Sequence, residues 1–415
     1  MADVSGYLHR ALKHFFGYDG FRPGQEAIIT EIMYKRPVLA VLPTGAGKSI
    51  CFQLPSLLRE GVTLVVSPLI SLMKDQAESL TRRGIPAAYL ESSLSGNEYG
   101  RVLHAVLNGR CKFLYVAPER LANPQFISFA KRANITMVAV DEAHCVSQWG
   151  HSFRKDYHNI PAFIDMLPVR PLIAAFTATA TPDVRRDILQ RLNIPNAKII
   201  VTGFDRPNLY FAVQRSADKD RALLDFLAKH KNECGVVYCA TRSKVEQVTT
   251  LLVKNGYLAL RYHAGLTPDE RQSNQNYFVG GQAKIIVATN AFGMGIDKAD
   301  VRFVVHYNMP KDVESYYQEA GRAGRDGNRA ECLLLYDKSD VAVNTYLIGH
   351  GEQDVAWKNH ELDLLDKMTA YCHTSGCLRN YLLAYFGEKT AIKGCGSCGN
   401  CSQTKNASWR KFLNL

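Results

Sequence analysis

The sequence predicts an α/β protein with two parallel sheets flanked by helices, followed by a small helical subdomain. Short apolar runs alternate with longer amphipathic stretches, and this alternation pauses near residues 203–208 and then restarts. Strands that alternate with helices form parallel sheets covered on both faces. Beyond about Ser339 the strand signals end, and two helix-like stretches and a Gly/Cys-rich loop follow.

The individual elements follow from these runs. The first set of buried strands is expected at residues 38–42, 63–66, 113–116 and 137–140, with helices between them such as 69–83 and 96–107. The second set is expected at residues 235–238, 283–287 and 302–305. We therefore expect a first lobe over residues 1–205, a second over 206–338 and a helical subdomain over 339–415, which the cysteine pattern described below predicts to bind zinc.

Composition limits the class of protein. The 415 residues suit two or three domains, and 47% hydrophobic with 21% charged residues is ordinary for a globular protein. No apolar run approaches the roughly 18 residues of a membrane span, and the first residues do not resemble a secretory signal. We expect an intracellular protein without a membrane partner, in a bacterial cytoplasm or nucleoid, or in the nucleus of a eukaryote. The net charge of +11 favours a polyanionic partner, nucleic acid first, although many basic enzymes bind none.

A candidate phosphate-binding loop lies between the first strand and a helix. It comprises Thr44, Gly45, Ala46, Gly47, Lys48 and Ser49. Glycines let backbone N–H groups close around phosphate oxygens, and the helix N-terminus adds positive charge. Lys48 would reach the β- and γ-phosphates of ATP, and the Ser49 hydroxyl would bind Mg²⁺. Leu42 stands where the strict motif has its first glycine, so a chance glycine turn before a helix is the alternative.

Two acidic residues end another predicted strand. Asp141 could hold Mg²⁺, and Glu142 could polarise the water that attacks the γ-phosphate. This tetrapeptide, with Ala143 and His144, is often only structural when it stands alone. Behind a phosphate loop it indicates ATP hydrolysis.

Two arginines end a helix-like run in the second lobe. Arg322 and Arg325 would share one helix face if the helix continued through them. An arginine brought to the γ-phosphate during transfer contributes about 10³–10⁵ in rate. The alternative is a solvated basic helix end with a glycine cap.

The 11 cysteines fall into two groups. Six lie at core-like positions and are expected to be reduced buried thiols: Cys51, Cys111, Cys145, Cys234, Cys239 and Cys332. Near the C-terminus, Cys395, Cys398 and Cys401 offer three thiolates for a structural zinc ion, which needs four ligands. Cys372 and Cys377 are candidates for the fourth, and His373 is a rival. A redox or disulfide role is the alternative.

Ordered motifs along nearly the whole chain resemble those of the RecQ family of superfamily 2 DNA helicases. They are GFRPGQ (20–25), PTGAGKS (43–49), SPLISLMKDQ (67–76), APERL (117–121), DEAHCVSQWGH (141–151), TATAT (177–181), YHAGL (262–266), AFGMGIDK (291–298) and QEAGRAGRDG (318–327). The resemblance implies two RecA-like lobes with ATP in the cleft. It also implies 3′-to-5′ DNA unwinding driven by ATP hydrolysis, in DNA repair or recombination.

The resemblance also implies roles for particular residues. Arg22 and Gln25 would contact the adenine, with Tyr18 stacking nearby. Gln318, Arg322 and Arg325 would face the nucleotide from the second lobe, and Arg325 matches the arginine finger. The family pattern favours Cys377 as the fourth zinc ligand, at a predicted helix start where a thiolate is stabilised.

Residues 147–157 resemble the family's aromatic-rich loop, which senses single-stranded DNA. The candidates for DNA contact there are Ser147, Gln148, Trp149, His151, Phe153 and Arg154. Stacking of a base on an aromatic ring contributes about 1–3 kcal/mol, although Trp149 and Phe153 could instead be core residues. Ser152 and Lys155 depart from the usual Asp and Pro, which puts the strength of the coupling to ATP hydrolysis in doubt.

Three further residues, Ser67, Lys74 and Arg120, match family positions along the DNA backbone, with ordinary surface charge as the alternative.

The last residues, 402–415, are too few for the winged helix of many relatives, so unwinding is expected to be weak or to use another wedge. The alternatives are a single-stranded DNA translocase or annealing factor, an RNA helicase, and a DNA-binding scaffold without turnover. Intact Lys48, Glu142 and Arg325 argue against the scaffold. We expect the protein to act as a monomer.

Overall fold

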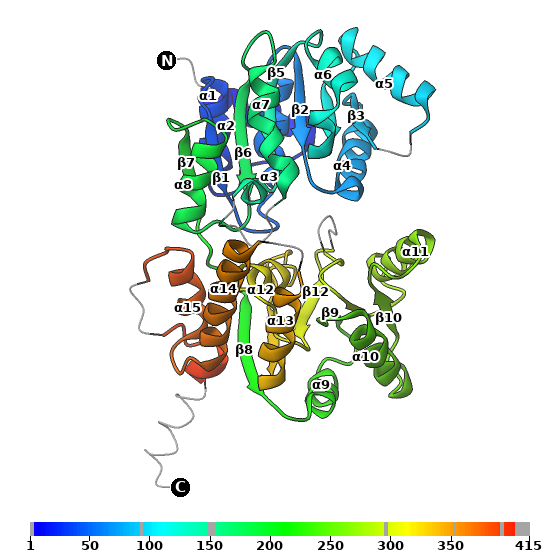
Figure 1. Cartoon of the computed structure of the whole chain (residues 1–415), viewed down its shortest axis with the longest axis vertical. Helices are drawn as coiled ribbons and strands as arrows, with labels where there is room; N and C mark the ends of the chain where they lie inside the picture. Colours follow the sequence, from blue (N-terminus) through cyan, green and yellow to red (C-terminus); the bar gives the residue numbers. More distant parts are fainter. Residues whose placement is uncertain are drawn as a thin grey trace. The chain divides into compact units, whose positions relative to one another are not determined.

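The computed structural model describes residues 4–91, 94–147, 149, 154–293, 298–351, 354–390 and 394–402. The chain separates into two units, Met1–Gly203 and Phe204–Leu415 (Figure 1). Each unit has its own sheet and its own core.

The first unit contains a seven-stranded sheet in the order β3-β4-β2-β5-β6-β1-β7. All of its strand pairs are parallel. The strands are β1 (Val38–Val41), β2 (Val62–Val66), β3 (Ala87–Leu90), β4 (Phe113–Val116), β5 (Ile135–Val140), β6 (Leu172–Thr177) and β7 (Lys198–Val201). The central strands β1, β2 and β4 are buried along their whole length, which explains their continuous apolar runs.

Helices connect these strands. They are α1 (Val4–Phe16), α2 (Gln25–Met33), α3 (Lys48–Leu57), α4 (Ile70–Arg82), α5 (Gly96–Leu107), α6 (Pro124–Ala130), α7 (Asn159–Asp165) and α8 (Pro182–Arg191), with short 3-10 turns η1 (Pro118–Ala122), η2 (Ala143–Val146) and η3 (Lys155–His158). Side chains that cap the helix N-termini determine where several of these helices begin. The Ser95 side chain forms a capping box with Glu98 at α5, and the Thr181 hydroxyl accepts from the Val184 N–H at α8.

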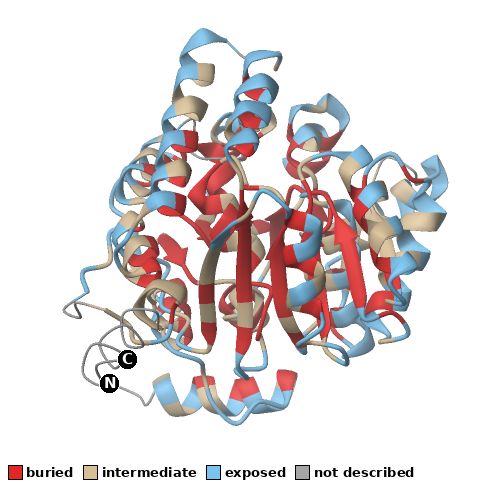
Figure 2. Cartoon of the chain, turned by 90° about the horizontal axis from the view of Figure 1, so that it is seen from below, coloured by how far each residue is buried: buried red, intermediate tan, exposed pale blue. Residues whose placement is uncertain are grey.

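The second unit contains a six-stranded parallel sheet in the order β10-β11-β9-β12-β13-β8. Its strands are β8 (Leu209–Arg215), β9 (Cys234–Tyr238), β10 (Ala259–Tyr262), β11 (Ile285–Ala288), β12 (Val301–His306) and β13 (Ala330–Tyr336), connected by α9 (Lys219–Leu227), α10 (Arg242–Lys254), α11 (Pro268–Val279) and α12 (Val313–Ala320). Figure 2 shows these strands buried between helices whose outward faces are exposed. The predicted α/β fold with two parallel sheets is confirmed.

Three helices follow the second sheet, α13 (Lys338–Gly349), α14 (Val355–His373) and α15 (Leu378–Tyr385). The sequence had predicted two helix-like stretches here, and that number is wrong. A capping box at Asp337 starts the additional helix, and Asp354 caps the next one. Helix α14 packs on α12, where the Tyr371 ring lies 5.1 Å from the Tyr316 ring. No helix among the described residues is both long and apolar enough to cross a membrane.

Candidate functional site

The phosphate-binding loop joins the end of β1 to the start of α3. Gly45 and Gly47 have φ angles of 83° and 78°, a left-handed region that strongly favours glycine. Gly47 is the N-cap of α3, so Lys48 and Ser49 stand in its first turn. The loop therefore presents backbone N–H groups and a helix N-terminus, the elements of an anion site.

Gln25 closes over this loop from the start of α2. Its side-chain amide donates to the carbonyl oxygens of Ala46 at 3.0 Å and Gly47 at 3.1 Å, and its own oxygen accepts from the Arg22 N–H at 2.8 Å. The Arg22 guanidinium donates to the Gly45 carbonyl oxygen. Gln25 is buried, whereas half of the Tyr18 side chain is exposed. Arg22 and Gln25 thus contact the phosphate loop, and their contact with adenine stays a prediction, as does that of Tyr18.

The acidic pair follows β5 at the same edge of the sheet as the phosphate loop, because both follow the carboxyl ends of parallel strands. Asp141 is buried, with an oxygen 3.4 Å from the Ser67 hydroxyl. Burial first, and then the negative charge of Glu142, raises the pKa of Asp141 to about 6, while the nearby Lys48 charge opposes the shift. Positive charge at this site would therefore stabilise the carboxylate.

Glu142 adopts φ 48°, the left-handed region, which is uncommon for a residue with a side chain. His144 approaches it, with Nδ1 3.3 Å from a Glu142 carboxylate oxygen and 2.8 Å from the Thr177 hydroxyl at the end of β6. The buried Tyr157 hydroxyl donates to the Asp141 carbonyl oxygen at 2.9 Å. These contacts hold the strained turn against two neighbouring segments, an arrangement often found at functional sites.

The candidate DNA contacts of the first unit differ in how far they are buried. Ser147 is fully buried and donates to Asp187 at 2.7 Å, while its oxygen accepts from the Trp149 N–H at 3.1 Å. The Trp149 side chain is 55% exposed, so it is not a core residue. Arg154 donates to the Pro68 carbonyl oxygen at 3.1 Å. Gln148, His151 and Phe153 lie outside the described residues.

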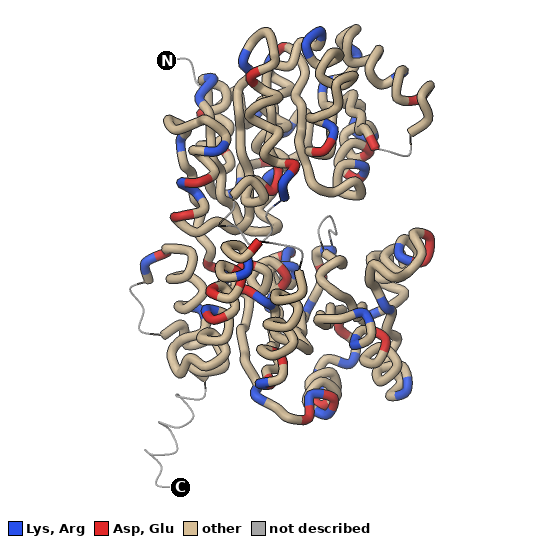
Figure 3. The backbone as a smooth tube through the Cα atoms, viewed as in Figure 1, with Lys and Arg blue, Asp and Glu red and all other residues tan. Residues whose placement is uncertain are grey.

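The structure also describes the positions of the three other residues predicted to contact DNA. Ser67 is buried beside Asp141. Lys74 is exposed on α4, and the Arg120 guanidinium lies 5.4 Å from the centre of the Tyr99 ring. Figure 3 shows Lys and Arg distributed over both units rather than gathered in one block.

The arginines of the second unit lie in a turn-rich loop rather than on one helix face, so that part of the sequence prediction is wrong. Helix α12 ends at Ala320, and Gly321 is its C-cap. Gln318 stands in its last turn, partly exposed. Arg322 is buried and donates to the Gly293 carbonyl oxygen. Arg325 is partly exposed. We call residues 321–328 the arginine loop.

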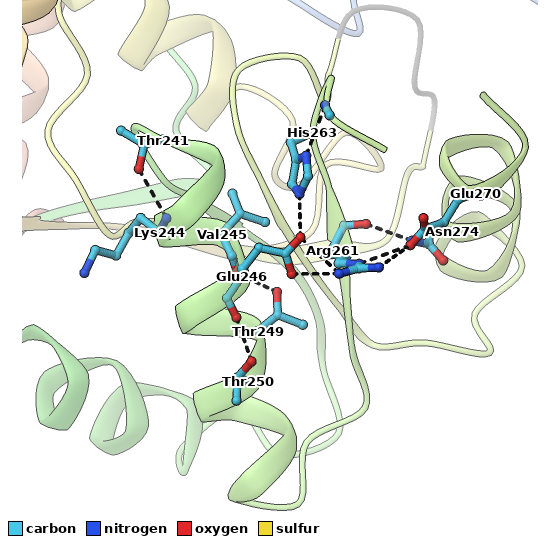
Figure 4. A network of polar contacts seen from close by, with 11 residues as sticks. Thr241, Lys244, Val245, Glu246, Thr249, Thr250, Arg261, His263, Glu270 and Asn274 are labelled. Atoms are coloured by element: carbon cyan, nitrogen blue, oxygen red, sulfur yellow. Dashed lines mark hydrogen bonds and ion pairs between the residues drawn. The ribbon is translucent and has the colours of Figure 1, made fainter. Parts of the chain in front are cut away.

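A polar network in the second unit was not predicted (Figure 4). Arg261 forms ion pairs with Glu246 and Glu270, both at 2.9 Å, and the buried His263 lies 2.8 Å from Glu246. His263 also lies 3.2 Å from the Gly265 N–H. The network ties the loop after β10 to α10 and α11. Its members lie on three successive elements between residues 246 and 270, and the YHAGL motif was the sequence signal that pointed to this place.

Four cysteines come together in the C-terminal region. The sulfur atoms of Cys377, Cys395, Cys398 and Cys401 all lie within 4.8 Å of one another. Burial opposes ionisation, but hydrogen bonds, the first of them from the Ser397 N–H, lower the pKa of Cys395 to about 7. The four thiols fit a closed tetrahedral zinc site.

Two alternatives for the fourth ligand are excluded. Cys372 is buried outside the cluster, and His373 lies 2.9 Å from the Tyr336 hydroxyl. Cys377 is the N-cap of α15, so its sulfur accepts from the Asn380 N–H at 3.5 Å. The six other thiols are free and buried, as predicted.

Comparisons with known proteins identify the same three parts. Residues 22–188 match the DEAD/DEAH box helicase family, residues 218–327 match the helicase conserved C-terminal domain, and residues 338–402 match the RecQ zinc-binding family. The ATP-dependent DNA helicase RecQ of Bacillus subtilis is 46% identical over 96% of this chain and 68% of its own length. The chain belongs to the RecQ family of ATP-dependent DNA helicases.

A second RecQ relative agrees with this assignment, and a solved structure of lower identity shares the fold alone. The RecQ helicase of Pasteurella multocida is 41% identical over 93% of this chain, which spans 61% of that protein's length. The helicase MrfA bound to DNA has the same fold, with a TM-score of 0.65 and 19% identity over 90% of this chain and 54% of that one. This RecQ chain is therefore an enzyme of the ATP-hydrolysing helicase class, with a zinc-binding region.

Proposed function

We propose that this chain hydrolyses ATP in response to single-stranded DNA, moves along that strand in the 3′-to-5′ direction and unwinds duplex DNA in repair or recombination. The observation that supports this most is the arrangement at the carboxyl edge of the first sheet. There the phosphate loop follows β1, and the Asp141–Glu142 pair and the segment toward Trp149 follow β5, which is separated from β1 in the sheet by β6. A motor needs its nucleotide site and its DNA contact to be mechanically connected.

The first unit supplies the groups that bind ATP. Backbone N–H groups of residues 44–47 bind phosphate oxygens, and Lys48 neutralises their charge. Tyr18, Arg22 and Gln25 contact the base. The Ser49 hydroxyl and the Asp141 carboxylate are oxygen ligands of the kind that Mg²⁺ prefers. Mg²⁺ would neutralise charge that develops on the phosphates.

Glu142 is the proposed base for the attacking water. His144 and the backbone strain at Glu142 orient its carboxylate toward one position rather than leaving it free to rotate. From the second unit we assign Gln318 and Arg322 to the nucleotide and Arg325 to the charge on the transferred phosphoryl group. An arginine in that role contributes about 10³–10⁵ in rate.

For DNA, the exposed Trp149 offers a face on which a base can stack. Ser147 and Ser67 are buried, so we propose that they transmit DNA contact rather than touch bases. Lys74, Arg120 and Arg154 supply positive charge for the backbone, and Gln148, His151 and Phe153 stay candidates in the same loop. We propose that the protein acts as a monomer. We place it in the bacterial cytoplasm or nucleoid, because two similar relatives are bacterial, or in the nucleus if its source is eukaryotic.

The test compares ATP hydrolysis without nucleic acid and with single-stranded DNA, duplex DNA or single-stranded RNA. Unwinding is then measured on duplexes with a 3′ or a 5′ tail. We expect strong stimulation by single-stranded DNA and unwinding of the 3′-tailed duplex alone. Lys48→Ala should abolish turnover and keep DNA binding, whereas Lys198→Ala, at an exposed position of β7, should change neither.

Two other results would change the proposal. Stimulation without unwinding would leave a single-stranded DNA translocase, the alternative considered from the sequence. ATP hydrolysis that does not respond to DNA would overturn both.

A further inference from the structure

Residues 204–209 form a connecting segment at the start of the second unit, and this segment contacts both the zinc-binding region and the arginine loop. On the zinc side the contact is Arg379, in the first turn of α15, two residues after the zinc ligand Cys377. Its guanidinium donates to the Asp205 carboxylate at 2.6 Å, the Arg206 carbonyl oxygen at 2.8 Å and the Leu209 carbonyl oxygen at 2.6 Å. Arg379 is 5% exposed, so its guanidinium is largely shielded from solvent, whereas the Asp205 side chain is 46% exposed.

Aromatic packing holds the same segment at its beginning. The Phe204 ring stacks on the Phe386 ring, with centroids 4.5 Å apart, and the Phe204 N–H donates to Glu388 at 2.7 Å. The Tyr317 hydroxyl donates to the Phe204 carbonyl oxygen at 2.5 Å. Phe386 and Glu388 directly follow α15. The zinc-binding region therefore defines the path of the backbone up to Leu209.

On its other side, the segment contacts the arginine loop through two side chains. The Arg206 guanidinium donates to the carbonyl oxygens of Gly321 at 3.3 Å, Ala323 at 3.0 Å and Gly324 at 3.1 Å. The Asn208 amide donates to those of Gly324 and Asn328, both at 2.9 Å. These carbonyls flank Arg322 and Arg325 in sequence. The Gly324 carbonyl oxygen also accepts from the Gly327 N–H at 3.1 Å within the loop, and Arg206 and Asn208 supply further donors to the carbonyls that follow the end of α12.

We propose that Arg206, assisted by Asn208, is a positioning residue for the arginine loop, and that Arg379 connects this support to the zinc-binding region. The proposal rests on the role assigned above to Arg325. Arg206 binds only backbone carbonyls in this loop, so it acts on where the loop lies and not on its charge. Since a shift of about 1 Å in a reacting group can cost about 10²-fold in rate, the support has a direct effect on ATP hydrolysis.

The first test is Arg206→Gln in the full-length, zinc-loaded chain. We expect the DNA-stimulated kcat to fall about ten-fold or more, with the KM for ATP, the affinity for single-stranded DNA and the zinc content within about two-fold of the parent. The matched control is Arg215→Gln, because Arg215 also donates to a carbonyl of the helical region, that of Cys372, but not to the arginine loop. If Arg206→Gln does not fold, Asn208→Ala tests the same loop with a smaller expected loss.

A double-mutant cycle decides whether Arg206 acts through Arg325. If it does, adding Arg206→Gln to Arg325→Ala should lower kcat by no more than about two-fold. Independent, multiplying losses would overturn the proposal. A normal kcat in Arg325→Ala would instead overturn the assigned role of Arg325. A slow Arg325→Ala with a normal Arg206→Gln would overturn only the positioning role.

The proposed link between Arg379 and the arginine loop can be tested by a measurement that does not depend on ATP hydrolysis. Hydrogen exchange of the amides in residues 321–328 should be faster in Arg206→Gln and Arg379→Gln than in Arg215→Gln. Arg379→Gln should also lower kcat while all four cysteines retain zinc. Asp205→Asn should have a smaller effect, because the carbonyl contacts of Arg379 remain. Unchanged exchange and kcat in Arg379→Gln would overturn the connection.

Discussion

The carboxyl group of Glu314 lies in surroundings that oppose its ionised form. Glu314 on α12 is 3% exposed, and its carboxylate accepts from the Tyr385 hydroxyl at 2.6 Å. Burial, and then the negative charge of Asp312, raises its pKa to about 7, although the Tyr385 hydroxyl and Lys367 oppose the shift. Asp312 caps the same helix, and Lys311 beside it pairs with Glu361. Glu314 therefore costs stability at neutral pH.

The sign of the resulting pH dependence follows from linkage. The folded carboxyl has a pKa of about 7 and an ordinary value of 4.5, so the folded state binds more protons between these values. The free energy of unfolding of the second unit should fall as pH rises from 5 to 7, by roughly 2 kcal/mol from this group. Glu314→Gln, which keeps an acceptor for Tyr385, should flatten this slope in denaturant titrations at pH 5–8. Asp269→Asn, at an exposed position of α11, should leave it unchanged.

At the scale of elements, the centre of the second sheet depends on one close approach between strands. Gly235 of β9 pairs with Phe303 of β12. A Cβ atom on Gly235 would lie 2.0 Å from the Phe303 ring, which is fully buried. The Phe303 ring occupies the space that any side chain at position 235 would need. The residue types at positions 235 and 303 therefore depend on each other.

Gly235→Ala should therefore destabilise the second unit by about 1–3 kcal/mol, the usual cost of overpacking a core. Phe303→Leu in the same chain should recover part of this loss, because it removes the colliding ring atoms. Gly100→Ala, on the exposed face of α5 with no atom within 4 Å of the new Cβ, should not destabilise the protein. Thermal unfolding of the four variants measures the comparison. Additive effects of Gly235→Ala and Phe303→Leu would contradict the steric explanation.

At the scale of the whole molecule, the chain divides its tasks between two units. The phosphate loop and the acidic pair belong to residues 1–203, whereas the arginine loop and the zinc-binding region belong to residues 204–415. Within the second unit, α14 packs on α12 through Tyr371 and Tyr316, and Arg379 reaches the connecting segment. Zinc should therefore stabilise the second unit without being needed for nucleotide binding by the first.

Cys398→Ser tests this division, because Cys398 is fully buried within the cluster. Structural zinc sites contribute their binding energy to folding, so we expect loss of zinc and a fall in the melting temperature of the second unit by roughly 5 °C or more. Binding of a fluorescent ATP analogue should persist. Cys372→Ala, outside the cluster, should keep one equivalent of zinc in metal analysis. Loss of zinc from Cys372→Ala would contradict the four-cysteine site.

The sequence by itself predicted the features that are encoded locally. Buried parallel strands appear as apolar runs, the phosphate loop as glycines before Lys48, and the zinc site as closely spaced cysteines. Their chemistry depends on neighbours in sequence, so spacing alone is informative. The prediction failed where a helix ends: Arg322 and Arg325 have helical spacing, but α12 stops at Ala320, where Gly321 follows.

Only the tertiary structure decided which distant residues meet. It placed Cys377, which the family resemblance had favoured, in the cluster and Cys372 outside it, placed Gln25 on the phosphate loop, and brought Arg206 and Arg379 to the two sides of one segment. The loop partners of Arg206 lie 115 to 118 residues away in the sequence, and Arg379 lies 173 residues from Arg206. Contacts of this kind depend on how sheets and helices pack, and hydrophobic periodicity specifies which face is buried but not what it is buried against.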